Sequence, residues 1–187
     1  MTAYQMRMQR DIQSIRLVSN GNVPELQLQT GMRWHLFLSH IWSSGQDQVA
    51  TIKRQLQLLL PGVAIFLDVD DLEDIGNLER YVDETQCILV FLSKGYFFST
   101  NCLRELDHAL NTNKPFILVH ETDPSKGGAP LADLRADCIA KGRDQLFERQ
   151  PKILTWQRLH DFQLETLKGI AAGLLHACRN TNSMSNP

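Results

Sequence analysis

The sequence predicts an α/β protein built on a flavodoxin-like, doubly wound sheet of five parallel strands with helices on both faces. Two observations predict this fold. Five short apolar runs alternate with segments in which apolar residues recur every three or four positions, as strands alternate with amphipathic helices. The apolar runs show no polar alternation, which is typical of parallel strands that are buried on both faces.

The expected strands are short, and each is bounded by turn-forming or polar residues. Right-handed crossovers between successive strand–helix units place helices on both sides of such a sheet. The five expected strands are Trp34–Leu38, Val63–Leu67, Ile88–Leu92, Phe116–Val119 and Ile153–Trp156.

The expected helices follow from apolar stripes at helical spacing. The first helix should end at Pro61-Gly62, since proline and glycine are helix stop signals. Two shorter helices are expected around residues 78–82 and 131–139. The stripe is formed by Val49, Ile52, Leu56 and Leu59 in the first helix, by Leu103, Leu106 and Leu110 after the third strand, and by Phe162, Leu167, Ile170, Leu174 and Cys178 in the last.

Composition and charge exclude several classes of protein. The chain has 187 residues and a formal net charge of -2, so it is long enough for one domain and gives no electrostatic reason to bind nucleic acid or an anionic membrane. No apolar run approaches the roughly 20 residues of a membrane span. Cys87, Cys102, Cys138 and Cys178 form no Cys-x-x-Cys pair, which favours reduced thiols in the cytoplasm over a zinc site or a disulfide framework.

Residues 32–179 are expected to form the folded domain. Residues 1–31 are polar and glutamine-rich and are interpreted as a linker or leader, and residues 180–187 as a disordered tail. The acidic stretch at 68–74 does not fit a calcium loop, because Leu72 and Glu73 occupy the positions of an oxygen ligand and a glycine. No metal site is expected.

Several common α/β chemistries are excluded by the residues that follow the expected strands. Residues 39–45 contain neither the Gly-x-Gly-x-x-Gly pattern of dinucleotide-binding folds nor a P-loop. The chain has no Gly-x-Ser-x-Gly elbow. A phospho-receiver needs acidic residues where this chain has Ser39 and Ser93.

Glu105 is the most distinctive candidate residue. It lies in the expected first turn of the helix after the third strand, beside the edge where open α/β sheets bind ligands. The helix N-terminus would help to keep this carboxylate charged there, and the structural alternative is a glutamate that merely favours the helix dipole. A capping box does not explain it, because Ser99, Thr100 and Asn101 all miss the three-residue offset.

Three segments resemble the Toll/interleukin-1 receptor (TIR) domain family. His35-Leu36-Phe37-Leu38-Ser39-His40 resembles its first box, residues 66–73 its second strand and the start of its BB loop, and Ser99-x-x-Cys102-x-x-Glu105-Leu106 its helix C box. The resemblance covers roughly residues 33–179 and includes Trp156 after the fifth strand. It is closest to the NAD-cleaving branch, both plant-type and axon-degeneration-type, because Glu73-Asp74-Ile75-Gly76 replaces the receptors' Arg-Asp-x-x-Pro-Gly signature.

The resemblance implies an NAD⁺ nucleosidase in immune or cell-death signalling. Glu105 would be catalytic, and NAD⁺ would be the substrate, with no further cofactor. The residues that would bind NAD⁺ are Ser39, His40, Trp42, Asp68, Leu78 and Cys102. The resemblance also implies homotypic self-association through a loop that contains Asp70, Leu72 and Gly76, with Gly76 as its flexible point.

One carboxylate suffices for this reaction. Nicotinamide leaves a cationic pyridinium as a neutral molecule, whereas an ordinary glycosidase needs two carboxylates. The product, linear or cyclic, and the choice between NAD⁺ and NADP⁺ stay open. No arginine or lysine lies between Ser39 and Lys53, so the pyrophosphate contacts are unassigned. The alternatives are a non-enzymatic TIR module that signals by assembly, with a structural Glu105, and a domain that binds a nucleotide signal.

Overall fold

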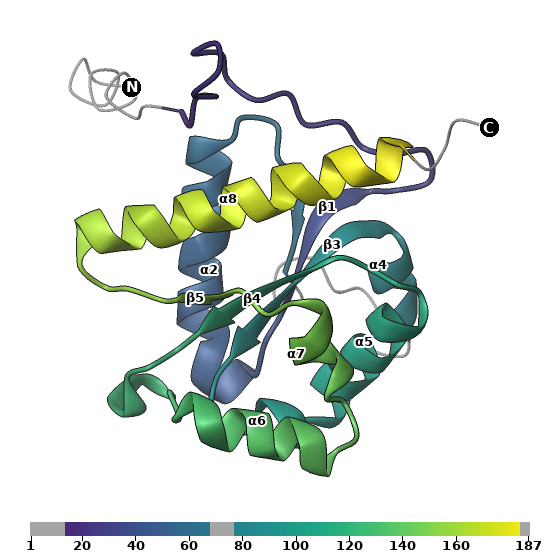
Figure 1. The fold of residues 1–187 in the computed structure, drawn as a ribbon, viewed down its shortest axis with the longest axis vertical. Coiled ribbons are helices and arrows are strands. Elements are labelled where there is room, and N and C mark those ends of the chain that lie inside the picture. Colours follow the sequence, from purple (N-terminus) through teal and green to yellow (C-terminus); the bar gives the residue numbers. More distant parts are fainter. Residues whose placement is uncertain (1–13, 68–76, 184–187) are drawn as a thin grey trace.

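Five parallel strands form one sheet in the computed structural model, which describes residues 14–67 and 77–183, with side chains up to residue 178. The strands are β1 (Trp34–Ser39), β2 (Ile65–Phe66), β3 (Thr85–Leu92), β4 (Phe116–His120) and β5 (Ile153–Thr155). Their order across the sheet is β2-β1-β3-β4-β5, and each neighbouring pair is parallel (Figure 1). The predicted flavodoxin-like sheet is confirmed.

Helices cover both faces of the sheet (Figure 1). The helices α2 (Trp42–Leu59) and α8 (His160–Ser183) pack on one face, and α4 (Leu78–Asp83), α5 (Thr100–Asn111), α6 (Leu131–Ala140) and α7 (Gln145–Arg149) on the other. Successive strand residues point to opposite faces. In β1, Leu36 and Leu38 therefore join the core under α2 and α8, whereas Phe37 joins the core under α5. This two-sided burial explains the uninterrupted apolar runs.

The apolar stripes lie where the sequence predicts them, with one exception. The predicted stripe of α2 is buried throughout. In α8, Leu167, Ile170 and Leu174 are buried, but Phe162 is 59% exposed. Phe162 belongs to the first turn of α8, which extends past the edge of the sheet (Figure 1).

Strands β2, β3 and β5 differ from the sequence prediction. β2 covers only Ile65 and Phe66 of the predicted Val63–Leu67, because only these two residues are in register with β1. β3 begins at Thr85, before the apolar run, and its polar Thr85 and Gln86 are buried. Burial of Thr85 is satisfied because its hydroxyl donates to the Tyr81 carbonyl oxygen at 2.7 Å. β5 is only partly buried, since it forms the edge of the sheet. The short helix α7 was not predicted, because its five residues are too few for an apolar period.

Both ends of the described chain adjoin the folded domain. Residues 14–33 contain no helix or strand, but Ile15 donates its backbone N–H to Leu59 and packs, with Leu26, against the core. At the other end α8 continues to Ser183, into the segment expected to be a tail. No helix among the described residues is long and apolar enough to cross a membrane.

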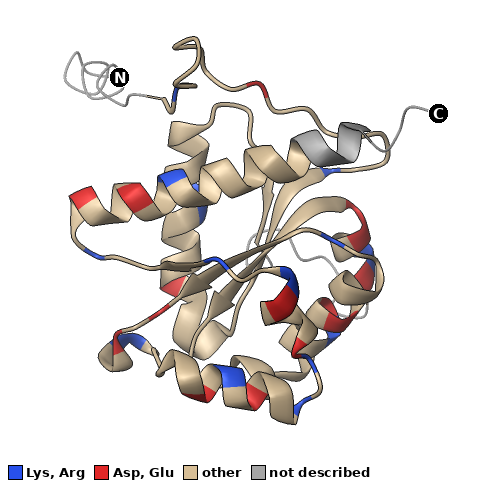
Figure 2. Ribbon diagram, in the orientation of Figure 1, with Lys and Arg blue, Asp and Glu red and all other residues tan. Residues whose placement is uncertain are grey.

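Charged residues lie on the surface helices and loops, where acidic and basic side chains are mixed (Figure 2). The five strands contain none. Within the part of the chain that the structure describes, Glu105 and Glu121 are the two buried carboxylates. A buried charge is costly unless it is paired and hydrogen-bonded, so these two residues call for an explanation.

Candidate active site

One wall of the candidate site comes from the end of β1 and the start of α2. Ser39, the last residue of β1, is buried. The His40 ring is held by two contacts, from Nδ1 to the Leu38 carbonyl oxygen at 3.1 Å and from Nε2 to Gln46 Oε1 at 2.8 Å. Trp42 begins α2 and is 54% exposed. The imidazole is therefore fixed, while the indole ring can contact a ligand.

The facing wall comes from the segment between β3 and α5. Gly95 has a φ of 86°, which glycine adopts without strain, and it leads into the 3₁₀ turn η2 (Tyr96–Phe98). Ser99 then caps α5, because its Oγ accepts the Cys102 backbone N–H at 3.3 Å. This cap fixes where α5 starts and so where Glu105 lies.

Glu105 belongs to a buried chain of hydrogen bonds. The Ser39 hydroxyl donates to Glu105 Oε2 at 2.6 Å, and Tyr96 Oη lies 2.7 Å from Ser39 Oγ. Since the single hydroxyl proton of Ser39 points at the carboxylate, Tyr96 donates to Ser39. Burial, reinforced by nearby Cys102 and Glu105, raises the pKa of Tyr96 well above its usual range, so the phenol keeps this proton. These two hydrogen bonds orient the Glu105 carboxylate.

The sequence placed Glu105 too close to the helix N-terminus. α5 begins at Thr100, and its first turn contains no acidic residue. The effect of the helix dipole falls off beyond the first turn, so it does not explain the presence of Glu105. The hydrogen bond from Ser39, on β1, holds its side chain instead.

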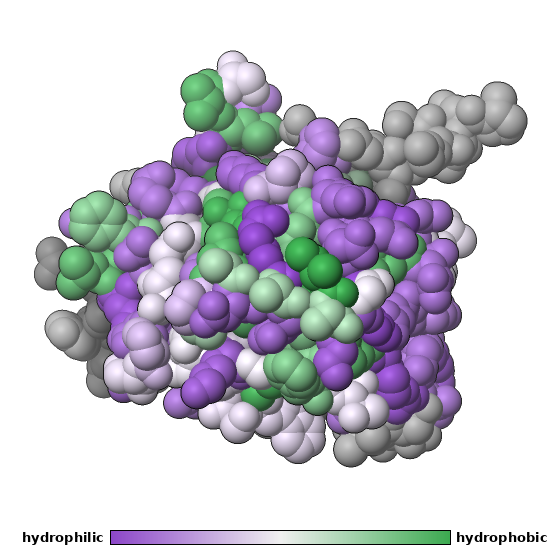
Figure 3. Space-filling model, turned by 60° about the horizontal axis from the view of Figure 1, so that its bottom comes forward, coloured by the Kyte–Doolittle hydropathy of each residue, from purple (hydrophilic) through white to green (hydrophobic). Residues whose placement is uncertain are grey.

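A cavity of about 500 Å³ opens in front of Glu105. It lies where the strand order reverses, between the ends of β1 and β3, which is where open α/β sheets bind ligands. Its volume is in the range of small-molecule sites. Figure 3 shows this edge of the molecule, where apolar patches lie among hydrophilic side chains. The lining residues are His40, Ile41, Trp42, Ser43, Gly95, Phe98, Ser99, Asn101 and Glu105.

The structure brings several predicted site residues together. His40 and Trp42 line the cavity together with Glu105. Ser39 lies behind the carboxylate and contacts it directly. Cys102 is buried and does not line the cavity, but its Sγ donates to the His40 carbonyl oxygen at 3.2 Å. It therefore links α5 to the chain that follows β1.

Of the remaining predicted residues, the structure describes only Leu78. Leu78 is buried at the start of α4 and is not a lining residue. Asp68 and the three predicted assembly residues, Asp70, Leu72 and Gly76, lie outside the described residues. Among residues 14–67 and 77–178, no group of three His, Cys, Asp or Glu side chains could hold a metal ion.

Sequence reasoning missed Tyr96, Phe98 and Asn101. Their place after the third expected strand, beside Gly95, is a signal that could have identified this loop as part of the site. The contact between Tyr96 and Ser39 had no such signal, because 57 positions separate the two residues.

Comparison with known proteins agrees with this architecture. The family profile of the TIR domain matches residues 36–149, and no curated protein sequence matches significantly. The TIR domain of the Toll-related receptor TRR-2 from Hydra magnipapillata superimposes with a TM-score of 0.52 at 12% identity, covering 75% of this chain and 98% of that one. A metazoan TIR-STING receptor from C. gigas, in complex with 2',3'-cGAMP, gives 0.53 at 13% identity, covering 82% and 42%.

The TIR domains of the activated Roq1 resistosome, which directly recognises the pathogen effector XopQ, give a TM-score of 0.49 at 19% identity, covering 73% of this chain and 96% of that one. At 12% and 13% identity, the structures from Hydra magnipapillata and C. gigas show the fold alone. The predicted family is confirmed by its profile, whereas the NAD-cleaving branch stays a prediction.

Proposed function

The chain belongs to the Toll/interleukin-1 receptor (TIR) domain family, and we propose that it is an NAD⁺ nucleosidase, which releases nicotinamide and leaves ADP-ribose or a cyclic isomer. One observation carries the proposal. The carboxylate of Glu105 is buried, is oriented by Ser39 and lines a ligand-sized cavity at the topological switch point. Such a carboxylate in a cleft is typical of a functional site.

The proposed reaction breaks the bond between C1′ of the ribose and the nicotinamide nitrogen. The bonding electron pair leaves with nicotinamide and neutralises its positive charge, so the leaving group needs no proton. Positive charge then develops on C1′ and the ring oxygen, where the Glu105 carboxylate stabilises it. Water adds to C1′ and loses a proton, which gives ADP-ribose. Attack by an adenine nitrogen, with the same loss of a proton, gives the cyclic isomer.

The neighbouring side chains have supporting roles in this proposal. Ser39 and Tyr96 hold the carboxylate in one orientation. A carboxylate that is oriented before the reaction stabilises developing charge without reorganisation. The exposed Trp42 offers an aromatic face for the nicotinamide or adenine ring.

Replacing Glu105 by glutamine tests the proposal. Glutamine has nearly the same shape but no charge, so we expect NAD⁺ cleavage to fall at least about a hundredfold while the thermal midpoint changes little. Glu148→Gln, at an exposed position of α7, is the matched control and should retain full activity. Unchanged turnover in a folded Glu105→Gln protein would refute the assignment, and so would an inactive wild type under conditions in which the chain self-associates.

A TIR module that signals by assembly alone is the second candidate. TIR domains self-associate homotypically, and three exposed apolar side chains, Trp42, Phe98 and Ile139, favour a contact surface on this chain. Such a module would assemble equally well with Glu105→Gln and would leave NAD⁺ intact. In either case four buried cysteines that form no disulfide fit a protein of the reducing cytoplasm.

A further inference from the structure

A second cavity, of about 450 Å³, adjoins the first. Trp42 and Ser43 line both cavities, so the two are neighbours across the start of α2. The first turns of α2 form one side of the second cavity, and the turn after β4 forms the other. Its chemistry differs from that of the first, because Ser43, Ser44, Ser125 and Lys126 line it with hydroxyl groups and an ammonium group.

The turn that carries Lys126 is held firmly against α2. The 3₁₀ turn η3 (Pro124–Lys126) is capped by Asp123, whose side chain accepts the Ser125 backbone N–H at 2.9 Å. Gln48 of α2 donates to the Lys126 carbonyl oxygen at 3.0 Å. Gly127 follows with a φ of 83°, and a Cβ there would lie 2.5 Å from Ser44 Cβ. The backbone of Lys126 is therefore fixed while its side chain is exposed.

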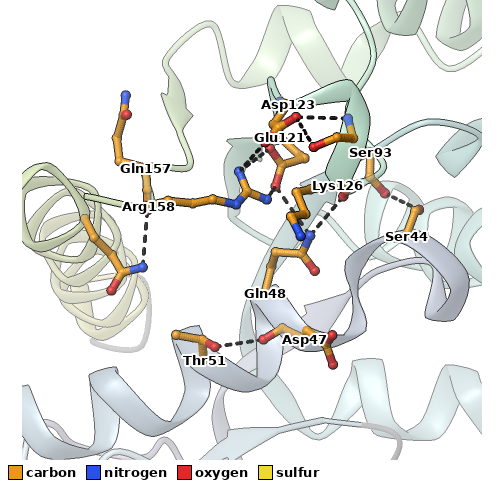
Figure 4. A network of polar contacts seen from close by, with 12 residues as sticks. Ser44, Asp47, Gln48, Thr51, Ser93, Glu121, Asp123, Lys126, Gln157 and Arg158 are labelled. Carbon is orange, nitrogen blue, oxygen red and sulfur yellow. Dashed lines mark hydrogen bonds and ion pairs between the residues drawn. The ribbon is translucent and has the colours of Figure 1, made fainter. Parts of the chain in front are cut away.

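An ion pair between the buried Glu121 and the partly exposed Arg158 adjoins this turn (Figure 4). Glu121, the second buried carboxylate, follows β4 and is fully buried. It accepts two hydrogen bonds from Arg158, at 3.0 and 2.5 Å, and the Asp123 backbone N–H at 2.8 Å. The two hydrogen bonds from Arg158 compensate the buried charge of Glu121. Arg158 therefore has a partner within the protein. Lys126 thus remains as the cation that the second cavity offers to a ligand.

We propose that the second cavity binds the diphosphate of NAD⁺ while the nicotinamide ribose occupies the first. This inference rests on the proposed function. In a dinucleotide the diphosphate is the group directly attached to the nicotinamide riboside, so it must lie next to the first cavity. Residues 40–52, which follow β1, contain no lysine or arginine that could bind the diphosphate. Lys126, in the turn after β4, supplies a positive charge for this purpose.

One residue that lines the second cavity carries a negative charge, which provides a second test of the proposal. Asp47, an exposed residue of α2, also lines this cavity. Its carboxylate would repel a diphosphate, so removing it and removing Lys126 should change binding in opposite directions. A purely structural role for these exposed side chains would not produce this pair of effects.

The test is titration calorimetry of the full chain with ADP-ribose, which has the diphosphate but no nicotinamide. Lys126→Gln should weaken binding about fivefold and Asp47→Asn should tighten it about twofold, sizes typical of exposed charge pairs. Both effects should shrink at high salt. Lys152→Gln is the control, because it changes the charge by the same amount and should leave the Kd unchanged. Lys152 lies just before β5, whereas both cavities lie where the parallel strands end. In NAD⁺ cleavage, Lys126→Gln should raise KM by the same factor and leave kcat unchanged.

Each outcome decides a separate question. If the wild type is inactive but still binds ADP-ribose with this dependence on Lys126 and Asp47, the proposed nucleosidase activity is refuted and the diphosphate site is supported. Active protein with equal KM in the wild type and Lys126→Gln would overturn the site and keep the nucleosidase. Undetectable binding of ADP-ribose, or inorganic pyrophosphate that binds as tightly as ADP-ribose, would also overturn the placement of the dinucleotide.

Discussion

Replacing Ser39 by alanine tests whether the buried hydrogen-bond chain holds Glu105. The change removes a hydroxyl that lies 2.6 Å from Glu105 Oε2 and 2.7 Å from Tyr96 Oη. It also leaves the Tyr96 hydroxyl without that partner at a fully buried site. A lost hydrogen bond to a carboxylate costs about 1.5 kcal/mol or more, and a buried unsatisfied hydroxyl costs about as much again. We expect Ser39→Ala to lower the free energy of unfolding by about 3 kcal/mol.

A double-mutant cycle separates these two contributions. Tyr96→Phe removes the phenol hydroxyl and keeps the bond from Ser39 to Glu105, so it should cost about 1 kcal/mol. The double variant should cost only about 2 kcal/mol, because no hydroxyl is then left unsatisfied. The single effects therefore exceed the double effect by about 2 kcal/mol.

The assay is urea unfolding of the four proteins, with a fall in the thermal midpoint of roughly 6–12 °C for Ser39→Ala as a second readout. If Glu105 is catalytic, Ser39→Ala should also lower kcat more than it changes KM. Single effects that add within about 0.5 kcal/mol would show that the two hydroxyls are not coupled and would refute the reasoning.

Two further predictions concern pH and self-association. Burial lowers the pKa of His35, whose Nδ1 accepts the Ala64 N–H at 2.9 Å; the unfolded chain then binds the extra proton first, so stability should fall as the pH drops below about 6.5. His35→Asn, which keeps an acceptor but cannot titrate, should show a smaller loss between pH 7 and 5, and an equal loss would contradict the assignment. Cleavage of NAD⁺ should rise more steeply than linearly with protein concentration, because the family resemblance implies that neighbouring copies complete the site. Gly76→Pro should suppress this rise without changing the thermal midpoint, and strictly linear activity in both proteins would place a complete site within one chain.

The fold could be predicted because its main determinants are local. The apolar run at Trp34–Leu38 and the stripe of α2 each predict the burial of their own residues. The alternation of such runs and stripes along the sequence predicts a parallel sheet. The start of β3 could not be predicted in this way. Thr85 is buried only because Tyr81 supplies a carbonyl acceptor, and this partner belongs to another element. The side-chain amide of the neighbouring Gln86 is buried with no hydrogen-bond partner among the described residues, so its burial follows from no local signal either.

The same reasoning explains what the sequence could and could not say about the site. Every crossover in a parallel sheet returns the chain to the same edge, so polar residues that follow different strands meet there. Ser39 at the end of β1, Ser93 after β3 and Glu121 after β4 all obey this rule. The rule identifies the set of residues at the edge but not their pairing. Arg158 reaches Glu121 across 37 positions, and Ser39 reaches Glu105 across 66. A search for polar residues within two positions after each apolar run finds Glu121 as well as Ser39, whereas the family motifs lead to Ser39 and Glu105 but not to Glu121.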